Sequence, residues 1–382
     1  MSKKVTFDGA PAPGMINFGV GQPSADLLPV ELMRVAADDF LRKAKPVELN
    51  YGERQGDIRF LETLAIFLSD EYGSTVTPDS LFVTAGNSQA LDFICALFTE
   101  PGDTVFVEEP SYFLAFKIFA DHGLNIVSIP VDEQGMMISR LEQELRQTRP
   151  KMLYTIPSFH NPGGQSMSAA RRTRLVELSR EYDFLIAADE VYQLLWYDQA
   201  PPAALGTMTE KGNIISLGSF SKILAPGLRL GWIQTSPDLM EQLLDSGAVN
   251  SGGSFNHFTS HIVRHALGLG LLQTLLKHLR QTYRNRVRAM DKALNDHVGQ
   301  LANWHCPQGG YFFWLEFSRD VNTMELRRMA EKYQTGFQPG ESFSSIGGLK
   351  NYMRLSFAHY QEADILEGVA RLGRLLRDQI QA

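Results

Sequence analysis

Short apolar segments separated by longer helix-like stretches constrain the fold of this chain more than any other feature. Seven of them are candidate strands: LFVTA (81–85), TVFVEE (104–109), NIVSIPV (125–131), MLYTIP (152–157), FLIAADE (184–190), NIISLGSF (213–220) and GWIQT (231–235). Between them, residues 166–182 begin with a serine and carry a broad apolar stripe, which is typical of a helix. This alternation favours a mostly parallel sheet with helices on both faces. Ligands of such sheets bind beyond the carboxyl ends of the strands, where functional residues are therefore expected.

The two ends of the chain have a different character from its middle. Residues 1–30 are rich in Gly and Pro and predict an extended arm. After about residue 240 the pattern predicts a long helix, a strand, a second helix and a strand, which together indicate a smaller α+β domain. These elements are a helix at 259–298, the strand YFFWLEF (311–317), a helix at 323–333 and the strand YMRLSFA (352–358).

The length of 382 residues suits a large domain plus a smaller one. We expect residues 1–45 to form an arm and part of the small domain. Residues 46–275 are expected to form the large domain, which binds the ligand, and residues 276–382 the small C-terminal domain.

Composition argues against several classes of protein. The net charge is −7 without a block of like charges, which disfavours nucleic acid or an anionic membrane as a partner. The only cysteines, Cys95 and Cys306, lie far apart, so we expect neither a disulfide framework nor a metal site. The sequence has no apolar run of about 18 residues and no secretory signal at its start. We therefore expect a cytoplasmic protein that does not span a membrane.

Lys222 is the first candidate for chemistry. It directly follows an apolar strand in SFSKILAPGLRLGW, with Ser219, Ser221 and Arg229 nearby. Partial burial and neighbouring positive charge lower the pKa of a lysine and make it a candidate for Schiff-base formation. Serine hydroxyls and a guanidinium suit a phosphate. The alternatives are a surface lysine at a helix start and the Ser-x-x-Lys motif of penicillin-binding enzymes, whose companion motifs Ser-Asp-Asn and Lys-Thr-Gly the sequence lacks.

Polar residues also follow two other strands. Asp189 ends the segment FLIAADE and Tyr192 comes three residues later. A carboxylate there can pair with a protonated pyridine nitrogen, although a metal-site fragment or a helix cap would look the same. Asn161 precedes Pro-Gly-Gly and could be presented into a cleft, or it could belong to an ordinary turn. We interpret His160 as its neighbour in the turn rather than a base, because no carboxylate or second histidine accompanies it at useful spacing.

A candidate anion site lies at the turn around Gly86. A strand, this glycine and an apolar helix follow one another, so the first N–H groups of the helix, with Asn87 and Ser88, could bind an anion. A plain strand–helix turn is the alternative. No nucleotide-binding glycine motif follows a strand, since the pair Gly19-x-Gly21 lies in the arm.

Tyr112 and Arg354 complete the set. Tyr112 lies just past a strand and could stack on a flat ring, or it could pack in the core. Arg354 lies within an apolar strand, where a buried guanidinium needs an anionic partner, either a ligand carboxylate or a structural salt bridge.

The joint order of these motifs resembles the pyridoxal-phosphate-dependent class I/II aminotransferases, of the aspartate-aminotransferase-like fold type I. The similarity is closest to the 2-aminoadipate/kynurenine aminotransferase branch. It extends from NYGERQGDIRFLETLA (50–65) to YMRLSFA, and SFSKILAPGLRLGW is its most specific part. The resemblance implies an α/β fold: a large domain with a mostly parallel seven-stranded sheet between helices, and a small α+β domain.

The resemblance also implies a role for each candidate residue. Lys222 would form the Schiff base with pyridoxal 5′-phosphate and carry the proton during transfer. Asp189 would keep the pyridine nitrogen protonated, Asn161 and Tyr192 would hydrogen-bond the ring oxygen, and Tyr112 would stack on the ring. The cofactor phosphate would be bound by Gly86, Asn87, Ser88, Ser219 and Arg229. Tyr51 would reach it from the neighbouring subunit, so a two-fold homodimer is expected.

The substrate site implied by the resemblance consists of Arg354, Asn161 and Gly21, with Arg354 on the α-carboxylate. The expected reaction moves an amino group between an L-amino acid and a 2-oxo acid such as 2-oxoglutarate. The same scaffold also hosts β-lyases and decarboxylases, and a non-catalytic effector-binding protein is a third alternative.

The chain departs from the family pattern at two places: the first concerns the side-chain contacts of Asn87 and Ser88 with the phosphate, and the second concerns specificity. The phosphate turn has Ala-Gly-Asn-Ser where relatives have Ser-Gly-Ser-Gln, and the first arginine is Arg34, where relatives acting on 2-aminoadipate have an arginine-bearing helix ahead of the arm. An apolar wall from Phe18, Val20, Phe159 and Tyr311 is expected instead. The sequence therefore predicts that neutral or aromatic amino acids are preferred over dicarboxylic ones.

Overall fold

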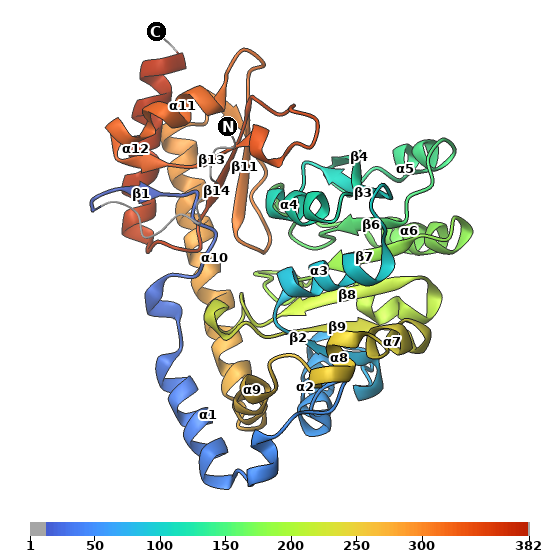
Figure 1. Cartoon of the computed structure of the whole chain (residues 1–382). Coiled ribbons are helices and arrows are strands. Elements are labelled where there is room, and N and C mark those ends of the chain that lie inside the picture. Colours follow the sequence, from blue (N-terminus) through green and yellow to red (C-terminus); the bar gives the residue numbers. More distant parts are fainter. Residues whose placement is uncertain (1–12, 381–382) are drawn as a thin grey trace.

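The computed structural model describes residues 13–380, which form a large lobe around an eight-stranded sheet and a smaller lobe around a four-stranded sheet (Figure 1). The large sheet has the order β2-β9-β8-β7-β6-β3-β4-β5. Its strands are β2 (Leu81–Thr84), β3 (Thr104–Glu109), β4 (Asn125–Asp132), β5 (Gly135–Met136), β6 (Met152–Thr155), β7 (Leu185–Asp189), β8 (Ile214–Ser219) and β9 (Gly231–Thr235). Strands β8, β7, β6, β3 and β4 run parallel, while β9 is antiparallel to both neighbours. The predicted mostly parallel sheet is confirmed, and β5 adds a short antiparallel strand to the seven that were expected.

Both faces of this sheet are buried. Phe106, Leu153 and Ile186 point to one face, where α5 and α6 cover them, and Tyr154 and Ala187 point to the other, which packs with α2, α3 and α4. Unbroken apolar strands are what a parallel sheet covered on both sides requires. The helices of this lobe are α2 (Ile58–Tyr72), α3 (Asn87–Phe98), α4 (Phe113–Asp121), α5 (Ile138–Leu145), α6 (Ala169–Glu181), α7 (Pro237–Leu244) and α8 (Gly247–Gly252).

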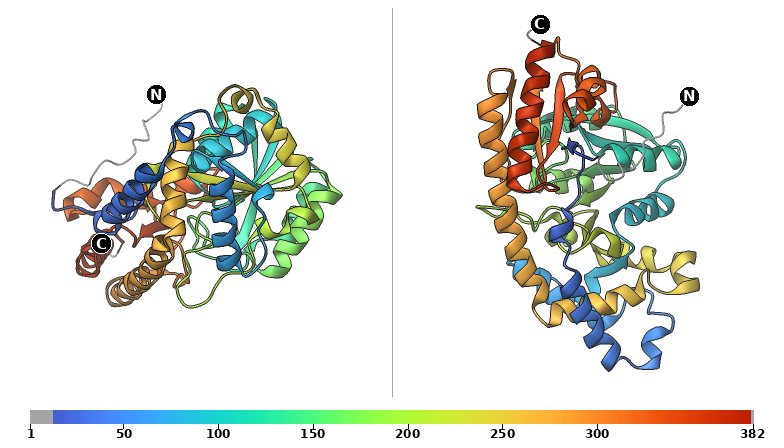
Figure 2. Two further views of the ribbon diagram at one scale, coloured as in Figure 1. Left: turned by 90° about the horizontal axis from the view of Figure 1, so that it is seen from below. Right: turned by 90° about the vertical axis from the view of Figure 1, so that its left-hand side faces the viewer.

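The long helix predicted for residues 259–298 is in fact two helices. They are α9 (His257–Gly268) and α10 (Leu271–His297), and the chain bends between them at Gly270, which has a φ of +70°. Glycine adopts this left-handed conformation readily, so it ends one helix before the next begins. Helix α10 then runs along the side of the molecule from the large lobe to the small one (Figures 1 and 2).

The small lobe contains an antiparallel sheet in the order β10-β11-β14-β13 and two helices. Its elements are β10 (Ala302–Asn303), β11 (Phe312–Phe317), α11 (Thr323–Ala330), β13 (Gln338–Pro339), β14 (Tyr352–Ser356) and α12 (Glu362–Ile380). Both expected strands and the helix after the first are present, whereas α12 was not anticipated. Helix α12 packs along α10 (Figure 2).

The arm joins the two lobes. Strand β1 (Ile16–Asn17) pairs with β12 (Thr335–Gly336) in the small lobe, and α1 (Val30–Lys43) packs on α9. Residues 1–12 of the expected arm lie outside the described residues. Domain boundaries near residues 45 and 275 remain a proposal. No helix in the described range 13–380 is long and apolar enough to cross a membrane.

Candidate active site

Lys222 lies where the end of strand β8 meets the arm. Its Nζ donates a hydrogen bond to the carbonyl of Gly21 at 2.9 Å and lies 5.2 Å from the centre of the Tyr311 ring. Burial and, to a smaller extent, the nearby charge of Arg354 lower the pKa of Lys222 to about 8, while Asp189 opposes both. The uncharged amine, the form that reacts with a carbonyl, is therefore accessible near neutral pH.

Asp189 ends strand β7 and is held by two donors. Asn87 Nδ2 lies 2.7 Å from its Oδ1, and the hydroxyl of Tyr154 lies 2.9 Å from its Oδ2. Burial raises the pKa of Asp189, and these hydrogen bonds and the charge of Lys222 counteract the rise. Tyr154 was not among the residues predicted from the sequence. Its signal was a hydroxyl-bearing side chain inside an otherwise apolar buried strand, which needs a partner.

Arg354 of strand β14 is 4% exposed. Its Nη1 donates to Asn161 Oδ1 and its Nη2 to the carbonyl of Gly19, both at 2.9 Å. The rings of Phe312 and Phe343 lie 4.1 and 4.9 Å from the guanidinium carbon. Burial lowers the pKa of Arg354 to about 10. Within residues 13–380 no carboxylate forms an ion pair with it, so this buried cation suits an anionic ligand.

Asn161 and His160 lie in one turn, and each has a partner from another part of the chain. Because Arg354 occupies Oδ1 of Asn161, the amide N–H groups of Asn161 remain to donate elsewhere. His160 Nδ1 accepts from the backbone N–H of Gly163 at 3.2 Å, and its Nε2 lies 3.1 Å from Glu108 Oε2, although the angle falls short of a hydrogen bond. The expectation that no carboxylate accompanies His160 is therefore wrong, because Glu108 reaches it from strand β3.

Gly86 and Arg229 form the other end of the site. Gly86 has a φ of +90°, and a Cβ there would lie 2.8 Å from Arg229 Nη2. Ser219 faces Gly231 across strands β8 and β9, and a Cβ on that glycine would lie 3.2 Å from Gly86 Cα. The structure thus brings Gly86, Ser219 and Arg229 together at the start of α3. Ser88 is exposed on the first turn of this helix.

Asn87 is placed differently from its neighbours in this turn. Its side chain contacts Asp189 and the carbonyl of Leu217 at 3.3 Å, so its amide is engaged at the carboxylate end of the site. The sequence could not show this direction, because the partner lies 102 residues away along the chain.

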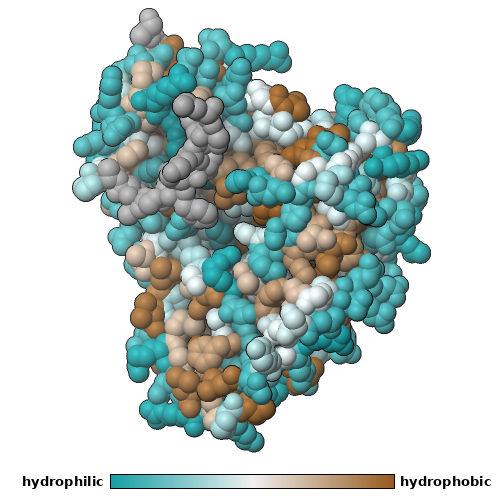
Figure 3. All heavy atoms as spheres, in the orientation of Figure 1, coloured by the Kyte–Doolittle hydropathy of each residue, from teal (hydrophilic) through white to brown (hydrophobic). Residues whose placement is uncertain are grey.

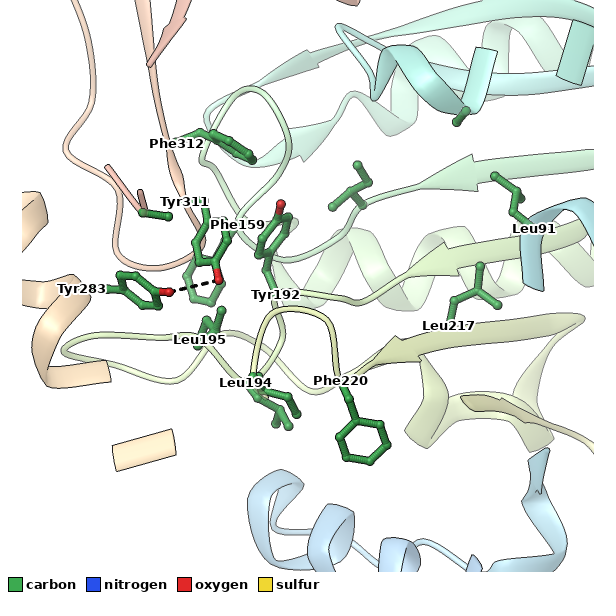
Figure 4. Close-up of a cluster of buried hydrophobic side chains, with 14 of the residues drawn as sticks. Leu91, Phe159, Tyr192, Leu194, Leu195, Leu217, Phe220, Tyr283, Tyr311 and Phe312 are labelled. Atoms are coloured by element: carbon green, nitrogen blue, oxygen red, sulfur yellow. Dashed lines mark hydrogen bonds between the residues drawn. The ribbon is translucent and has the colours of Figure 1, made fainter. Parts of the chain in front are cut away.

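The three candidate tyrosines lie in different surroundings. Tyr192 is buried, with ring centres 5.4 Å from Tyr311 and 5.9 Å from Phe312, and its hydroxyl points away from the hydrogen-bonded Tyr283–Tyr311 pair (Figure 4). Tyr112 precedes α4, and burial together with the charge of Asp189 raises its pKa to about 12. Tyr51 is 83% exposed.

The apolar wall expected beside the substrate is only partly correct. The Phe18 ring packs edge-on against Tyr360 at 5.8 Å and touches Gly368 of α12, so it points away from Arg354. Phe312 takes that place, because it covers Arg354 and lies against Gly21. The sequence of the arm does not show to which side each side chain points, so the direction of Phe18 could not be predicted from it.

The arrangement fits a phosphate-bearing pyridine cofactor. Arg229 and the start of α3 offer positive charge at one end, Asp189 offers a buried carboxylate at the other, and the charges of both Arg229 and Asp189 act on Lys222. No group of three or more potential metal ligands occurs among the described residues. Fold and site together define a pyridoxal-phosphate-dependent enzyme of the aspartate-aminotransferase fold.

The chain belongs to the aminotransferase class I and II family, whose model matches residues 13–372. It is 32% identical to aromatic-amino-acid aminotransferase 1 of Thermococcus litoralis, over 96% of this chain and 89% of that protein. A kynurenine aminotransferase of Pyrococcus horikoshii, solved in complex with PMP, superposes with a TM-score of 0.91 at 32% identity, covering 97% of this chain and 93% of that one. An alpha-aminoadipate aminotransferase of Thermus thermophilus, complexed with N-(5′-phosphopyridoxyl)-L-leucine, gives a TM-score of 0.88 at 31% identity, covering 97% and 94%.

These similarities confirm the family, the fold, the cofactor and the reaction predicted from the sequence. The protein is an aminotransferase that uses pyridoxal phosphate, an amino acid and a 2-oxo acid. They do not favour a β-lyase, a decarboxylase or a non-catalytic effector-binding protein.

Proposed function

We propose that this aminotransferase prefers neutral or aromatic L-amino acids as donors and uses a 2-oxo acid such as 2-oxoglutarate as acceptor. The observation that carries this proposal is the setting of Arg354, a buried guanidinium covered by the rings of Phe312 and Phe343. Arg354 serves one carboxylate, and aromatic surface next to it favours an uncharged side chain because burying an unpaired carboxylate is costly.

The first arginine of the chain does not supply a second cation to this site. Arg34 lies on α1 with 66% of its side chain exposed, and it pairs with Glu31 at the surface. The relatives act on aromatic amino acids, kynurenine and alpha-aminoadipate by name, so the family alone does not decide the preference.

Three groups act on the reacting part of the substrate and the ring. Pyridoxal phosphate, when bound, supplies an electron sink for charge at the substrate Cα. Lys222 holds and moves the proton at that carbon, and its pKa of about 8 makes the amine available as a base. Asp189 stabilises the protonated ring nitrogen, and Asn87 and Tyr154 orient its two oxygens. The side chain of Asn87 therefore acts on Asp189 and does not bind the phosphate.

The remaining roles concern binding. Arg354 holds the α-carboxylate, and Asn161, fixed by Arg354, donates its free amide hydrogens to the ring oxygen together with Tyr192. Gly21 leaves room beside Phe312, since a Cβ would come within 3.2 Å of that ring. Tyr112 stacks on the cofactor ring. The phosphate is bound by Ser88, Ser219, Arg229 and the backbone N–H groups of Gly86 and Asn87.

The active unit is a two-fold homodimer in which Tyr51 reaches the partner's cofactor phosphate. Supporting this, exposed apolar side chains lie close to Tyr51 along the chain: Val47 is 68% exposed and Leu49 66%. Figure 3 shows apolar surface at the lower end of the molecule, where the segment between α1 and α2 lies in Figure 1. An apolar patch of this kind marks a protein interface. A cytoplasmic location agrees with the free thiols of Cys95 and Cys306.

The substrate proposal is tested by kcat/KM for leucine, phenylalanine, 2-aminoadipate and glutamate with 2-oxoglutarate as acceptor. We expect leucine or phenylalanine to exceed both dicarboxylates by about tenfold or more, the cost of one unpaired buried charge being at least that large. A clear preference for 2-aminoadipate or glutamate contradicts the proposal.

A further inference from the structure

Arg172 is a buried charge to which the roles above give no function. It lies on α6 and is 1% exposed. Its donors reach the carbonyls of Pro157 at 2.7 Å, Met167 at 3.0 Å and Ala203 at 3.0 Å, and the hydroxyl of Ser158 at 2.7 Å. A guanidinium is kept in a core only when its donors are satisfied, and here loop atoms satisfy them.

Most of these partners lie at the two ends of the loop that carries Asn161. Pro157 and Ser158 precede it and Met167 follows it. Arg172 therefore ties both ends of the loop to α6 and leaves the turn with Asn161 at its tip.

The same guanidinium also faces the loop that follows β7. Its Nη1 lies 3.7 Å from Oε1 of Glu190, the residue next to Asp189. Ser158, which accepts from Arg172, donates in turn to the side-chain oxygen of Gln193, the residue next to Tyr192. Arg172 is thus connected to both loops that present groups to the cofactor ring.

The sheet alone cannot set the spacing of these two loops. Strands β6 and β7 are paired only as far as Thr155 opposite Ala188, and beyond that point no ladder joins them. Asn161 and Asp189 nevertheless have to meet two fixed positions on one rigid ring, the ring oxygen and the ring nitrogen, so their separation has to be fixed by contacts beyond the strand ladder. Arg172 is a buried group that contacts both loops, directly and through Ser158.

We propose that Arg172 is a positioning residue that fixes Asn161 relative to Asp189 around the cofactor ring. The inference rests on the proposed roles of Asn161 and Asp189. A lysine at this position keeps the charge but cannot bind both loops at once. Its ammonium is a point charge, whereas the planar guanidinium of arginine reaches both loops. Arg172→Lys therefore keeps a cation in the core but loosens the spacing between the two loops.

The neighbouring residue provides a matched control. Arg171 also lies on α6 and also binds a carboxylate and a backbone carbonyl, namely Asp132 at 2.6 Å and Gly135 at 2.8 Å, but it contacts neither loop. Arg171→Lys is therefore the same chemical change one position away.

The test is the pH at which the visible absorption of the bound cofactor changes, measured for the wild type, Arg172→Lys and Arg171→Lys. A donor on the ring oxygen stabilises the deprotonated cofactor, so a misplaced Asn161 raises this midpoint. We expect a rise of about half to one pH unit in Arg172→Lys, which corresponds to one weakened hydrogen bond, and less than about 0.2 unit in the control. Ser158→Ala, which cuts the link to Gln193, should shift the midpoint in the same direction by less.

Thermal unfolding of the cofactor-free proteins separates positioning from stability. An Arg172→Lys protein that unfolds at a lower temperature while its midpoint stays at the wild-type value overturns the inference, because the residue is then only structural. If Arg172→Lys does not fold, an unchanged midpoint in Ser158→Ala overturns it. A wild-type band that does not respond to pH contradicts the proposed roles of Asn161 and Asp189 themselves.

Discussion

The environment of Lys222 links its reactivity to the stability of the protein. Burial and the charge of Arg354 lower the pKa of this amine from 10.5 to about 8, although the charge of Asp189 partly offsets the decrease. Between these two pH values the folded protein binds fewer protons at this position than the unfolded chain does. Lys222 therefore destabilises the cofactor-free fold most below pH 8, and this cost falls as the pH rises toward 10.5.

Lys222→Met should consequently stabilise the cofactor-free protein at pH 7 by about 1–3 kcal/mol, because it replaces a buried charged side chain with an uncharged one of similar volume. The gain should shrink as the pH is raised from about 8 to 10. Urea unfolding of both proteins across this range measures it. A gain that is the same at pH 7 and pH 10 would show that the effect comes from packing and not from titration.

At this scale the sequence identified residue types better than their directions. Lys222, Asp189 and Arg354 each follow or lie within a strong apolar strand, so their burial could be predicted. The contacts Asn87–Asp189 and His160–Glu108 could not, because each joins segments that only tertiary packing brings together. Phe18 was assigned to the wrong side for the same reason.

Among the elements, the seven predicted strands all occur, since a parallel strand buried on both faces leaves an apolar run that little else produces. Strand β5 has two residues and is too short for any pattern. The break at Gly270 was missed because helical periodicity continues on both sides of it, and only the positive φ of the glycine marks the bend.

The turn between β2 and α3 has a requirement of its own. Gly86→Ala places a Cβ 2.8 Å from Arg229 Nη2, in addition to the strain of a φ of +90°. Because Arg229 has to move, we expect the affinity for pyridoxal phosphate to fall by about 10- to 100-fold, the effect of one or two charge-assisted hydrogen bonds. Fluorescence titration of the cofactor-free protein measures the Kd.

Gly102→Ala is the control for this change. Gly102 has a similar φ of +97°, and no atom lies within 4 Å of the added Cβ. Gly102→Ala therefore introduces a similar backbone strain, about 1 kcal/mol, without any contact to Arg229. Equal losses of cofactor affinity in both variants would mean that strain, and not the position of Arg229, explains the result.

The whole molecule presents an apolar end around Tyr51 that the single chain leaves exposed. Leu49→Glu puts a charge into this surface and should shift the proposed homodimer toward monomer, with weaker cofactor binding because the proposed contact of Tyr51 with the partner's cofactor is lost. Analytical ultracentrifugation at about micromolar concentration measures the mass. Ile346→Glu, at a position 75% exposed on the small lobe, is the matched control and should leave the dimer intact. A Leu49→Glu protein that stays dimeric and retains its cofactor contradicts the proposed interface.

The central claim, amino-group transfer through Lys222, is tested most directly by a product balance in a single half-reaction. The protein loaded with pyridoxal phosphate is mixed with phenylalanine in the absence of any 2-oxo acid, and the released 2-oxo acid, ammonia and carbon dioxide are counted. We expect about one equivalent of the matching 2-oxo acid per chain and neither ammonia nor carbon dioxide. In Lys222→Ala this conversion should not proceed at the wild-type rate. Stoichiometric release of ammonia or carbon dioxide, or an unimpaired Lys222→Ala protein, would contradict it.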